Sequence, residues 1–228
     1  MPTQEFEFRA IQSRRRPVRL LAWMIAVAVS LAGGTVTPDH VPVRPDSESA
    51  AANFVHESRL AVVRAAPDFT LNDQSNQVFR FSKQDGRVRL VSFIFTTCSG
   101  SCPATTSRMV GVQQDLSRRG HLKDRRVQLL SITLDPARDT AEKLRDYMKL
   151  YDADPANWTF LTGSVDQVNK TVAAWGMWAK PAANGQLDHP SRIFLVDKQG
   201  RIREIYHLGF LKSPWVVEDI ELLLAEGR

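Results

Sequence analysis

The sequence has few cysteines. Only Cys98 and Cys102 occur among 228 residues. Two cysteines cannot build a disulfide scaffold, and without a second pair they do not match the usual pattern of a structural zinc site. They can form one redox pair or supply part of a metal site. Repeats and low-complexity tracts are also missing. With 43% apolar and 24% charged residues, the composition excludes a largely disordered chain, a collagen-like chain and a multi-span membrane protein.

A strong charge of one sign is missing from most of the chain. The formal net charge is +5, but residues 1–32 hold five arginines against two glutamates, and the remainder holds 25 basic and 23 acidic side chains. A body this close to neutrality does not attract nucleic acid electrostatically. We therefore expect no nucleic-acid partner.

Long apolar runs are absent except near the N-terminus. Residues 14–19 are rich in arginine, and the 13 residues Leu20–Ala32 that follow are apolar apart from Ser30. Because a membrane-spanning helix needs roughly 20 apolar residues, this run is short, and a basic flank before a short apolar core is typical of an export signal. We expect residues 1–36 to be an export signal or, alternatively, an uncleaved membrane anchor, with the body outside the cytoplasm.

The next segment differs in composition from the rest of the chain. Residues 37–64 contain Pro38, Pro42 and Pro45 among small and polar side chains, which predicts a tether. The folded body is predicted over residues 65–228, which is an ordinary length for one domain.

Apolar patterns predict the elements of this body. The expected strands are a hairpin of residues 67–71 and 78–81 joined through Asn72-Asp73, buried strands at 89–95 and 127–134, a short strand at 158–161 and a hairpin of 193–196 and 202–206. Helices are expected to begin at Pro103, at the Asp139-x-x-Glu142 pattern, at the capping box of Ser164 and Gln167, and at Ser213-Pro214, with Gly227 as a stop.

Strands that alternate with helices predict an α/β protein with parallel strands in the centre of its sheet. The cysteine pair lies where the first central strand leads into its helix. This layout is typical of a thioredoxin-like fold. We expect a three-layer sandwich with a central mixed sheet and an added N-terminal hairpin.

The segment Cys98-Ser99-Gly100-Ser101-Cys102-Pro103 is the part of the chain that most needs a chemical explanation. It follows the carboxyl end of a strand, where open α/β sheets place their ligand sites. Gly100 lets the loop bend, and the helix that we expect to begin at Pro103 should lower the thiol pKa through its dipole. The two cysteines lie about one turn apart, which permits a disulfide or a shared metal ion.

Two thiolates are soft ligands that suit Cu(I), or Zn(II) with two further ligands. Of five histidines, His40 and His56 lie in the tether, His121 in an expected exposed turn and His207 past the last strand. His189 precedes the strand at 193–196, whose start should face the cysteine loop, and we expect it to be the third ligand. The long loop at 177–188 could carry His189 into and out of the site.

Four segments, 95–103, 131–140, 158–163 and 188–197, resemble the Sco family of copper chaperones. The resemblance covers the chain from about residue 65 onward. It implies one copper ion, as Cu(I), Cu(II) or both, bound by Cys98, Cys102 and His189, with the cysteines also acting as a redox-active pair. It implies Asp135 as an acidic group near the metal. It also implies a body in the periplasm of a bacterial cell envelope, tethered to the membrane if the leader is uncleaved.

The same resemblance implies a metallochaperone and thiol–disulfide protein that assists assembly of the binuclear copper centre of cytochrome c oxidase. Its partner would be the copper-receiving subunit of the oxidase or another copper protein. Apart from thiol–disulfide reductase activity, no enzymatic reaction is expected.

Three alternatives remain open from the residues. The first is an exported thiol–disulfide oxidoreductase or redox sensor that delivers no metal. The second is a peroxidase with Cys98 as the attacked thiolate, although no activating arginine can be nominated. The third is a secreted binding domain with Trp178 on its partner surface. Trp175 fits the apolar face of its helix, and we expect it to pack in the core.

Overall fold

The computed structural model describes residues 60–226, so the expected export signal, most of the tether and Gly227 lie outside the described residues. The helices are α1 (Ser101–Arg118), α2 (Ala141–Leu150), α3 (Val165–Ala174) and α4 (Ser213–Ala225), with short 3-10 helices η2 (Phe81–Gln84), η3 (Ala183–Gly185) and η4 (Leu208–Phe210). In residues 60–226, no helix is both long and apolar enough to cross a membrane.

The strands of the main sheet are β1 (Arg64–Ala65), β2 (Thr70–Asp73), β3 (Val78–Arg80), β4 (Val88–Ile94), β5 (Val127–Thr133), β6 (Trp158–Thr162), β9 (Arg192–Val196) and β10 (Arg201–His207). They lie in the order β1-β10-β9-β4-β5-β6-β2-β3. β4, β5 and β6 are parallel, whereas β9 runs antiparallel to β4 and β10 antiparallel to β9. The predicted mixed sheet is confirmed. A separate ribbon pairs β7 (Lys180–Pro181) with β8 (Leu187–Asp188).

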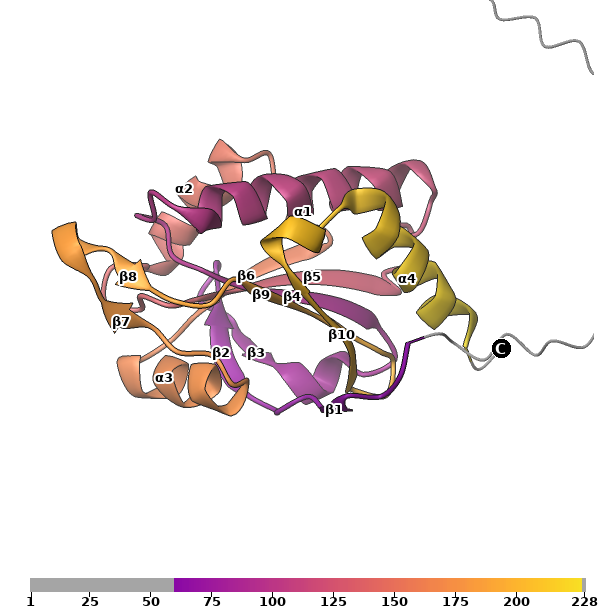
Figure 1. Cartoon of the computed structure of the whole chain (residues 1–228), viewed down its shortest axis with the longest axis horizontal. Coiled ribbons are helices and arrows are strands. Elements are labelled where there is room, and N and C mark those ends of the chain that lie inside the picture. The colour runs from indigo at the N-terminus through magenta and orange to yellow at the C-terminus, as the bar shows by residue number, and fades with distance from the viewer. Residues whose placement is uncertain (1–59, 227–228) are drawn as a thin grey trace, which may run out of the picture. The chain divides into compact units, whose positions relative to one another are not determined.

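The sheet lies between two layers of helices. Figure 1 shows α1, α2 and α4 over one face and α3 on the other. β4 and β5 are buried along their whole length, as expected for central strands covered on both faces. This arrangement is the three-layer, thioredoxin-like sandwich that the sequence predicts.

The layer under α3 is built around one aromatic side chain. Trp175 is 1% exposed, and its ring lies 5.2–6.2 Å from the ring centroids of Phe69, Phe81, Phe93 and Phe194. Its indole N–H donates to the carbonyl of Pro67. The expectation that Trp175 packs in the core is confirmed.

The predicted N-terminal hairpin is present at the β6 side of the sheet. β2 pairs with both β3 and β6. Asn72 and Asp73 end β2 instead of forming the turn, which follows them. The Asp73 carboxylate organises that turn by accepting from the backbone N–H groups of Ser75 and Gln77.

Two helix starts differ from the sequence prediction. α1 begins at Ser101, before Pro103, because a proline within the first turn removes only an N–H that has no intrahelical partner. α2 is capped by Thr140, whose hydroxyl accepts from the backbone N–H of Lys143. Asp139 is therefore not the cap of α2. The capping box of Ser164 and Gln167 in α3 is present as predicted.

Residues that the composition assigns to the tether lie along the sheet edge. Arg64 pairs with Ile202 in β10, and the Val63 N–H donates to the Ile202 carbonyl. The Leu60 carbonyl accepts from the guanidinium of Arg203. The folded body therefore reaches back to at least Leu60.

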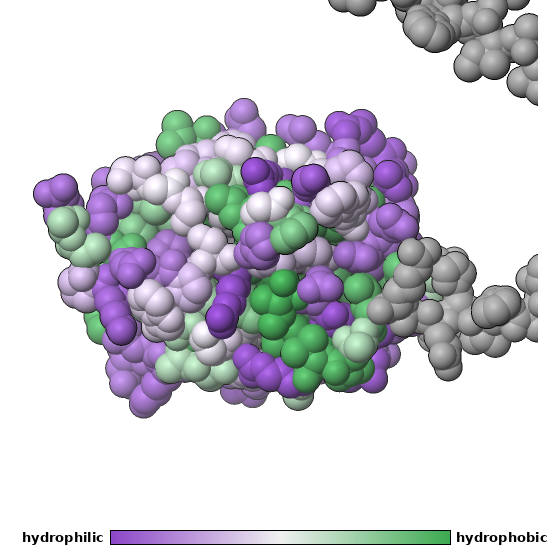
Figure 2. Space-filling model, in the orientation of Figure 1, coloured by the Kyte–Doolittle hydropathy of each residue, from purple (hydrophilic) through white to green (hydrophobic). Residues whose placement is uncertain are grey.

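Apolar side chains remain exposed near this edge. Val62, Val63 and Ile205 are partly exposed, as are Phe210 and Trp215 after β10. Figure 2 shows apolar surface gathered around the position of β10 and β1 in Figure 1.

Candidate metal centre

Neighbouring strands bring the three predicted ligands to one edge of the sheet. Cys98 lies in the loop after β4, and Cys102 lies in the first turn of α1, which that loop joins to the strand. His189 directly follows β8 and precedes β9. Because β9 runs antiparallel beside β4, the start of β9 meets the end of β4. The topology therefore brings His189 to the cysteine loop, although it lies 87 positions after Cys102 in the sequence.

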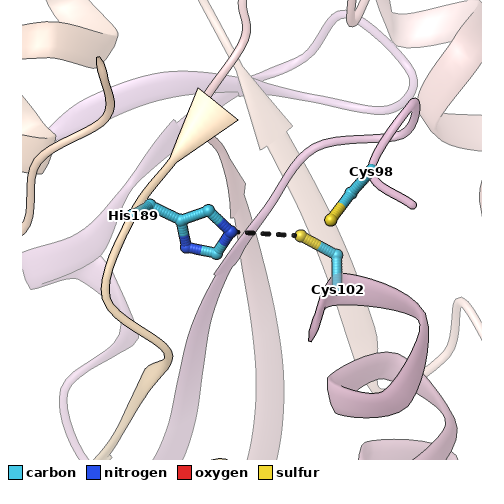
Figure 3. A group of neighbouring side chains, drawn as sticks. All are labelled: Cys98, Cys102 and His189. Atoms are coloured by element: carbon cyan, nitrogen blue, oxygen red, sulfur yellow. Dashed lines mark hydrogen bonds between the residues drawn. The ribbon is translucent and has the colours of Figure 1, made fainter. Parts of the chain in front are cut away.

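The three side chains point toward one another (Figure 3). The Cys102 Sγ lies 3.6 Å from the His189 Nε2, and the ligand atoms of Cys98, Cys102 and His189 all lie within 4.8 Å of one another. With metal–ligand bonds of about 2.0–2.3 Å, donor atoms arranged at 120° lie about 3.5–4.0 Å apart. The group therefore needs little rearrangement to surround one ion. It is also the only group of three or more such side chains found close enough to hold a metal in residues 60–226.

The imidazole is oriented by its surroundings. Its Nδ1–H donates to the Pro190 carbonyl at 3.2 Å, which leaves the lone pair of Nε2 directed to Cys102. The ring of Phe95 packs edge-to-face against His189, with centroids 5.7 Å apart. These contacts hold His189 in the tautomer that a metal ligand requires.

The cysteine loop is folded around its first sulfur. The Cys98 N–H donates to the Phe95 carbonyl at 3.2 Å, and the Gly100 N–H donates to the Cys98 Sγ at 3.3 Å. Both thiols are free, with Cys98 partly exposed and Cys102 buried. The Gly100 N–H therefore fixes the position of the Cys98 sulfur within its own loop.

Burial changes the acidity of the second thiol. It raises the pKa of Cys102, and the nearby Cys98 and Asp139 raise that pKa further. A hydrogen bond with the backbone of Phe95 lowers the pKa, but by less than burial raises it. The expectation that the α1 dipole lowers the pKa is therefore wrong for Cys102, because desolvation outweighs the dipole. Without a cation, this side chain stays a neutral thiol. A bound cation would displace its proton, so metal binding and proton release are coupled.

Two acidic side chains follow β5, and they have different partners. Asp135 pairs with the guanidinium of Arg138. Asp139 is fully buried, and its carboxylate accepts from the hydroxyl of Thr133 at 2.6 Å and the hydroxyl of Thr96 at 2.5 Å. The Thr96 N–H also donates to it, at 3.2 Å. Asp139 thus supports the strand end two residues before Cys98. Sequence reasoning treated it as a helix start and missed this role.

Burial also affects Asp139 itself. Desolvation raises its pKa, and the hydrogen bonds from Thr133 and Thr96 oppose that rise. The hydrogen bonds are the reason that a buried carboxyl group is tolerated at this position.

A second residue that the sequence did not reveal is Gln186, which precedes β8. Its Oε1 accepts from the Ser99 N–H at 3.0 Å, and its Nε2 donates to the Thr97 carbonyl at 3.0 Å. A glutamine in a polar loop has no pattern that marks it in a single sequence. Only the fold shows that it touches both sides of Cys98.

The other histidines have different surroundings. His121 Nε2 lies 2.7 Å from a carboxylate oxygen of Glu221, and His207 Nδ1 accepts from the Gly209 N–H. Neither belongs to the metal-binding group. His40 and His56 lie outside the described residues.

The fold and this site define a thioredoxin-like protein with two cysteines and a histidine placed to hold a soft metal ion. The SCO1/SenC family model matches residues 58–224. The chain belongs to this family, and the predicted Sco resemblance is confirmed.

Individual relatives agree with this assignment. The chain is 28% identical over 158 residues to the SCO1 protein homolog of Bacillus subtilis, covering 67% of this chain and 79% of the relative. The structure of Bradyrhizobium japonicum ScoI with copper bound matches with a TM-score of 0.61 at 23% identity, covering 70% of this chain and 99% of that one. BsSco, described as a Sco-family cytochrome c oxidase assembly protein with a disulfide switch, matches with a TM-score of 0.63 at 23% identity, covering 73% of this chain and 98% of that one. At these identities the structural matches establish the fold.

Proposed function

We propose that this protein binds one copper ion through Cys98, Cys102 and His189 and delivers it to another protein. The observation that carries the proposal is the convergence of two sulfurs and one imidazole nitrogen within 4.8 Å. The copper-bound state of the ScoI relative supports the choice of metal.

The donor set itself favours copper. Two thiolates are soft ligands that suit Cu(I), and an imidazole suits copper in either oxidation state. A structural zinc site takes four protein ligands, and the group found among residues 60–226 supplies three. Two thiolates and a neutral imidazole around Cu(I) carry a net charge of −1, which the N-terminus of α1 stabilises.

A chaperone must both hold and release its cargo. Cys98 is partly exposed, whereas Cys102 is buried. An acceptor can therefore approach the ion from the Cys98 side and replace the ligands one at a time. We propose that the acceptor is the copper-receiving subunit of cytochrome c oxidase or another copper protein, as the description of BsSco as an oxidase assembly protein suggests.

The same cysteines can also act as a reductant. Two thiols that pass two electrons and two protons to an acceptor disulfide become a disulfide, and the acceptor gains two thiols. We propose this as a second activity that prepares acceptor cysteines for copper. The basic and apolar leader in residues 14–32 supports a body in the periplasm, where disulfides form.

The metal-free oxidoreductase is the competing proposal. His189 disfavours it, because a thiol exchange reaction does not need an imidazole 3.6 Å from the buried sulfur. A peroxidase is disfavoured further, since no arginine is among the hydrogen-bond partners described for the two sulfurs.

Copper titration of the anaerobically purified protein tests the proposal. We expect one copper ion per chain and protection of both thiols from alkylation, and we expect Cys98→Ser to abolish tight Cu(I) binding. Ser107→Ala, in the exposed part of α1, is a suitable control. Reduction of a disulfide substrate with no copper retained by the unaltered protein would favour the oxidoreductase instead.

A further inference from the structure

One side chain joins the segment that carries His189 to the loop that carries Cys98. The carboxamide of Gln186 accepts from the Ser99 N–H and donates to the Thr97 carbonyl, each at 3.0 Å. Thr97 and Ser99 flank Cys98 in the chain, and Gln186 precedes His189 by three residues. The position of one proposed ligand is therefore coupled to that of another.

A carboxamide is well suited to this bridge. It presents an acceptor and a donor on one planar group, and the loop offers an N–H at Ser99 and a carbonyl at Thr97. A glutamate would keep the acceptor but place negative charge against the Thr97 carbonyl. An alanine would remove both hydrogen bonds. Substitutions of Gln186 can therefore break the bridge in part or completely.

The β7–β8 hairpin has few other polar attachments near the site, and Leu187 of β8 packs against the hydrophobic core. β7 and β8 pair over two residues each, and the tip at Ala183–Gly185 is exposed. Arg138 lies against that tip, because a Cβ placed on Gly185 would stand 3.4 Å from its guanidinium. Among the hydrogen bonds described for residues 60–226, those between this hairpin and the Cys98 loop come from Gln186. Gln186 is therefore the main polar link between them.

Building on the copper-binding function proposed above, we propose that Gln186 is a positioning residue that keeps His189 in the metal site. Loss of its two hydrogen bonds loosens the hairpin, so that His189 is held less firmly beside the two sulfurs. Two thiolates alone still bind Cu(I), whereas Cu(II) depends more strongly on nitrogen ligands. Gln186 therefore determines how well the protein retains Cu(II) relative to Cu(I).

The test compares Gln186→Ala and Gln186→Glu with the unaltered protein in two measurements. In the metal-free protein, Gln186→Ala should speed hydrogen exchange at the Ser99 amide by about fivefold, since one hydrogen bond is lost. In copper titrations it should raise the dissociation constant for Cu(II) by about 10- to 100-fold, as loss of an outer-shell partner typically does, and that for Cu(I) by less than about threefold. The thiolate-to-Cu(II) absorption band should shift in the same direction as in His189→Ala.

Matched variants make the result specific. Gln186→Glu retains the acceptor for the Ser99 N–H, so its Ser99 exchange and Cu(II) affinity should fall between those of the unaltered protein and Gln186→Ala. Gln199→Ala removes a glutamine from the β9–β10 turn, where its side chain bonds to Arg201, and should leave both measurements unchanged.

The outcomes separate this inference from the proposed function. Unchanged Cu(II) affinity in Gln186→Ala, or equal weakening of Cu(I) and Cu(II), would overturn the positioning role while copper binding stands. Unchanged Ser99 exchange would also overturn it, because the bridge would then not hold the loop. If the unaltered protein takes up neither ion, the proposed function fails and this inference fails with it.

Discussion

Asp139 holds Thr96 through three contacts, because its buried carboxylate accepts from both the hydroxyl and the backbone N–H of Thr96. Thr96 lies two residues after the end of β4 at Ile94 and two residues before Cys98. A carboxylate from the segment before α2 thus fixes the point at which the cysteine loop leaves the sheet. Asp139 therefore supports the cysteine loop, whereas Asp135, which the family resemblance implies as the acidic group near the metal, pairs with Arg138.

We predict that Asp139→Ala weakens copper binding by about 10- to 100-fold, because the Cys98 loop loses its support. It should also destabilise the fold by about 2–3 kcal/mol, since the buried hydroxyl of Thr133 and the partly buried hydroxyl of Thr96 lose a charged partner. Copper titration and urea unfolding measure the two effects.

Asp135→Ala is the matched comparison. Its carboxylate pairs with the partly exposed Arg138, so the cost in stability should stay below about 1 kcal/mol. If Asp135→Ala weakens copper binding more than Asp139→Ala does, then Asp135 is the acidic group that supports the metal and our assignment is incorrect.

His189→Ala should separate the two oxidation states of copper. With both thiols intact, Cu(I) should still bind, whereas the dissociation constant for Cu(II) should rise by on the order of 100-fold or more, since even outer-shell losses cost 10–100-fold. The thiolate-to-Cu(II) absorption band should shift as the nitrogen ligand is lost. His207→Ala is the control, because His207 interacts with Gly209 and Phe210. A His189→Ala protein with unaltered Cu(II) absorption would show that the imidazole is not a ligand.

The sequence predicted most of the fold because its signals are local. The apolar runs of β4 and β5, the capping box at Ser164 and the hairpin of residues 193–196 and 202–206 each depend on neighbouring residues. The site was predicted in part for the same reason, since the cysteine motif is continuous in the chain. The position of His189 could be predicted only by assuming the topology of the fold, in which β9 lies beside β4.

The features that sequence reasoning missed depend on contacts between distant segments. Asp139 reaches Thr96 across 43 positions, and Gln186 reaches Ser99 across 87. The thiol pKa of Cys102 was assigned the wrong direction because helix position is visible in a sequence, whereas burial is not. Such effects arise only once the layers have packed.

Trp175→Ala should destabilise the protein strongly. The substitution opens a cavity among four phenylalanines under the sheet, and a buried tryptophan replaced by alanine typically costs about 3–5 kcal/mol. Trp178→Ala removes a ring that is 41% exposed and should cost less than about 1 kcal/mol. Urea unfolding measures both. Equal effects of the two substitutions would contradict the core position of Trp175.

The stability of the β9–β10 end of the sheet should depend on pH through Asp197. Its side chain is 1% exposed and accepts from the Arg201 guanidinium and backbone N–H, and from the guanidinium of Arg203. Burial alone would raise the pKa of Asp197, but the hydrogen bonds from Arg201 and Arg203 outweigh it and the net pKa is lowered. The folded state therefore binds this proton more weakly than the unfolded chain does.

It follows that Asp197 stabilises the fold fully above its unfolded pKa of about 3.9, and that the stabilisation is lost as the pH falls below that value toward the folded pKa. We predict that Asp197→Asn lowers the free energy of unfolding by about 2–3 kcal/mol at pH 7, as expected for the loss of charge-assisted hydrogen bonds. The difference from the unaltered protein should shrink as the pH is lowered below about 4. Asp166→Asn breaks the exposed pair with Lys170 and is the control, because an exposed ion pair contributes little to stability. A difference between Asp197→Asn and the unaltered protein that stays constant from pH 7 to pH 3 would mean that the Asp197 carboxylate titrates normally in the folded state.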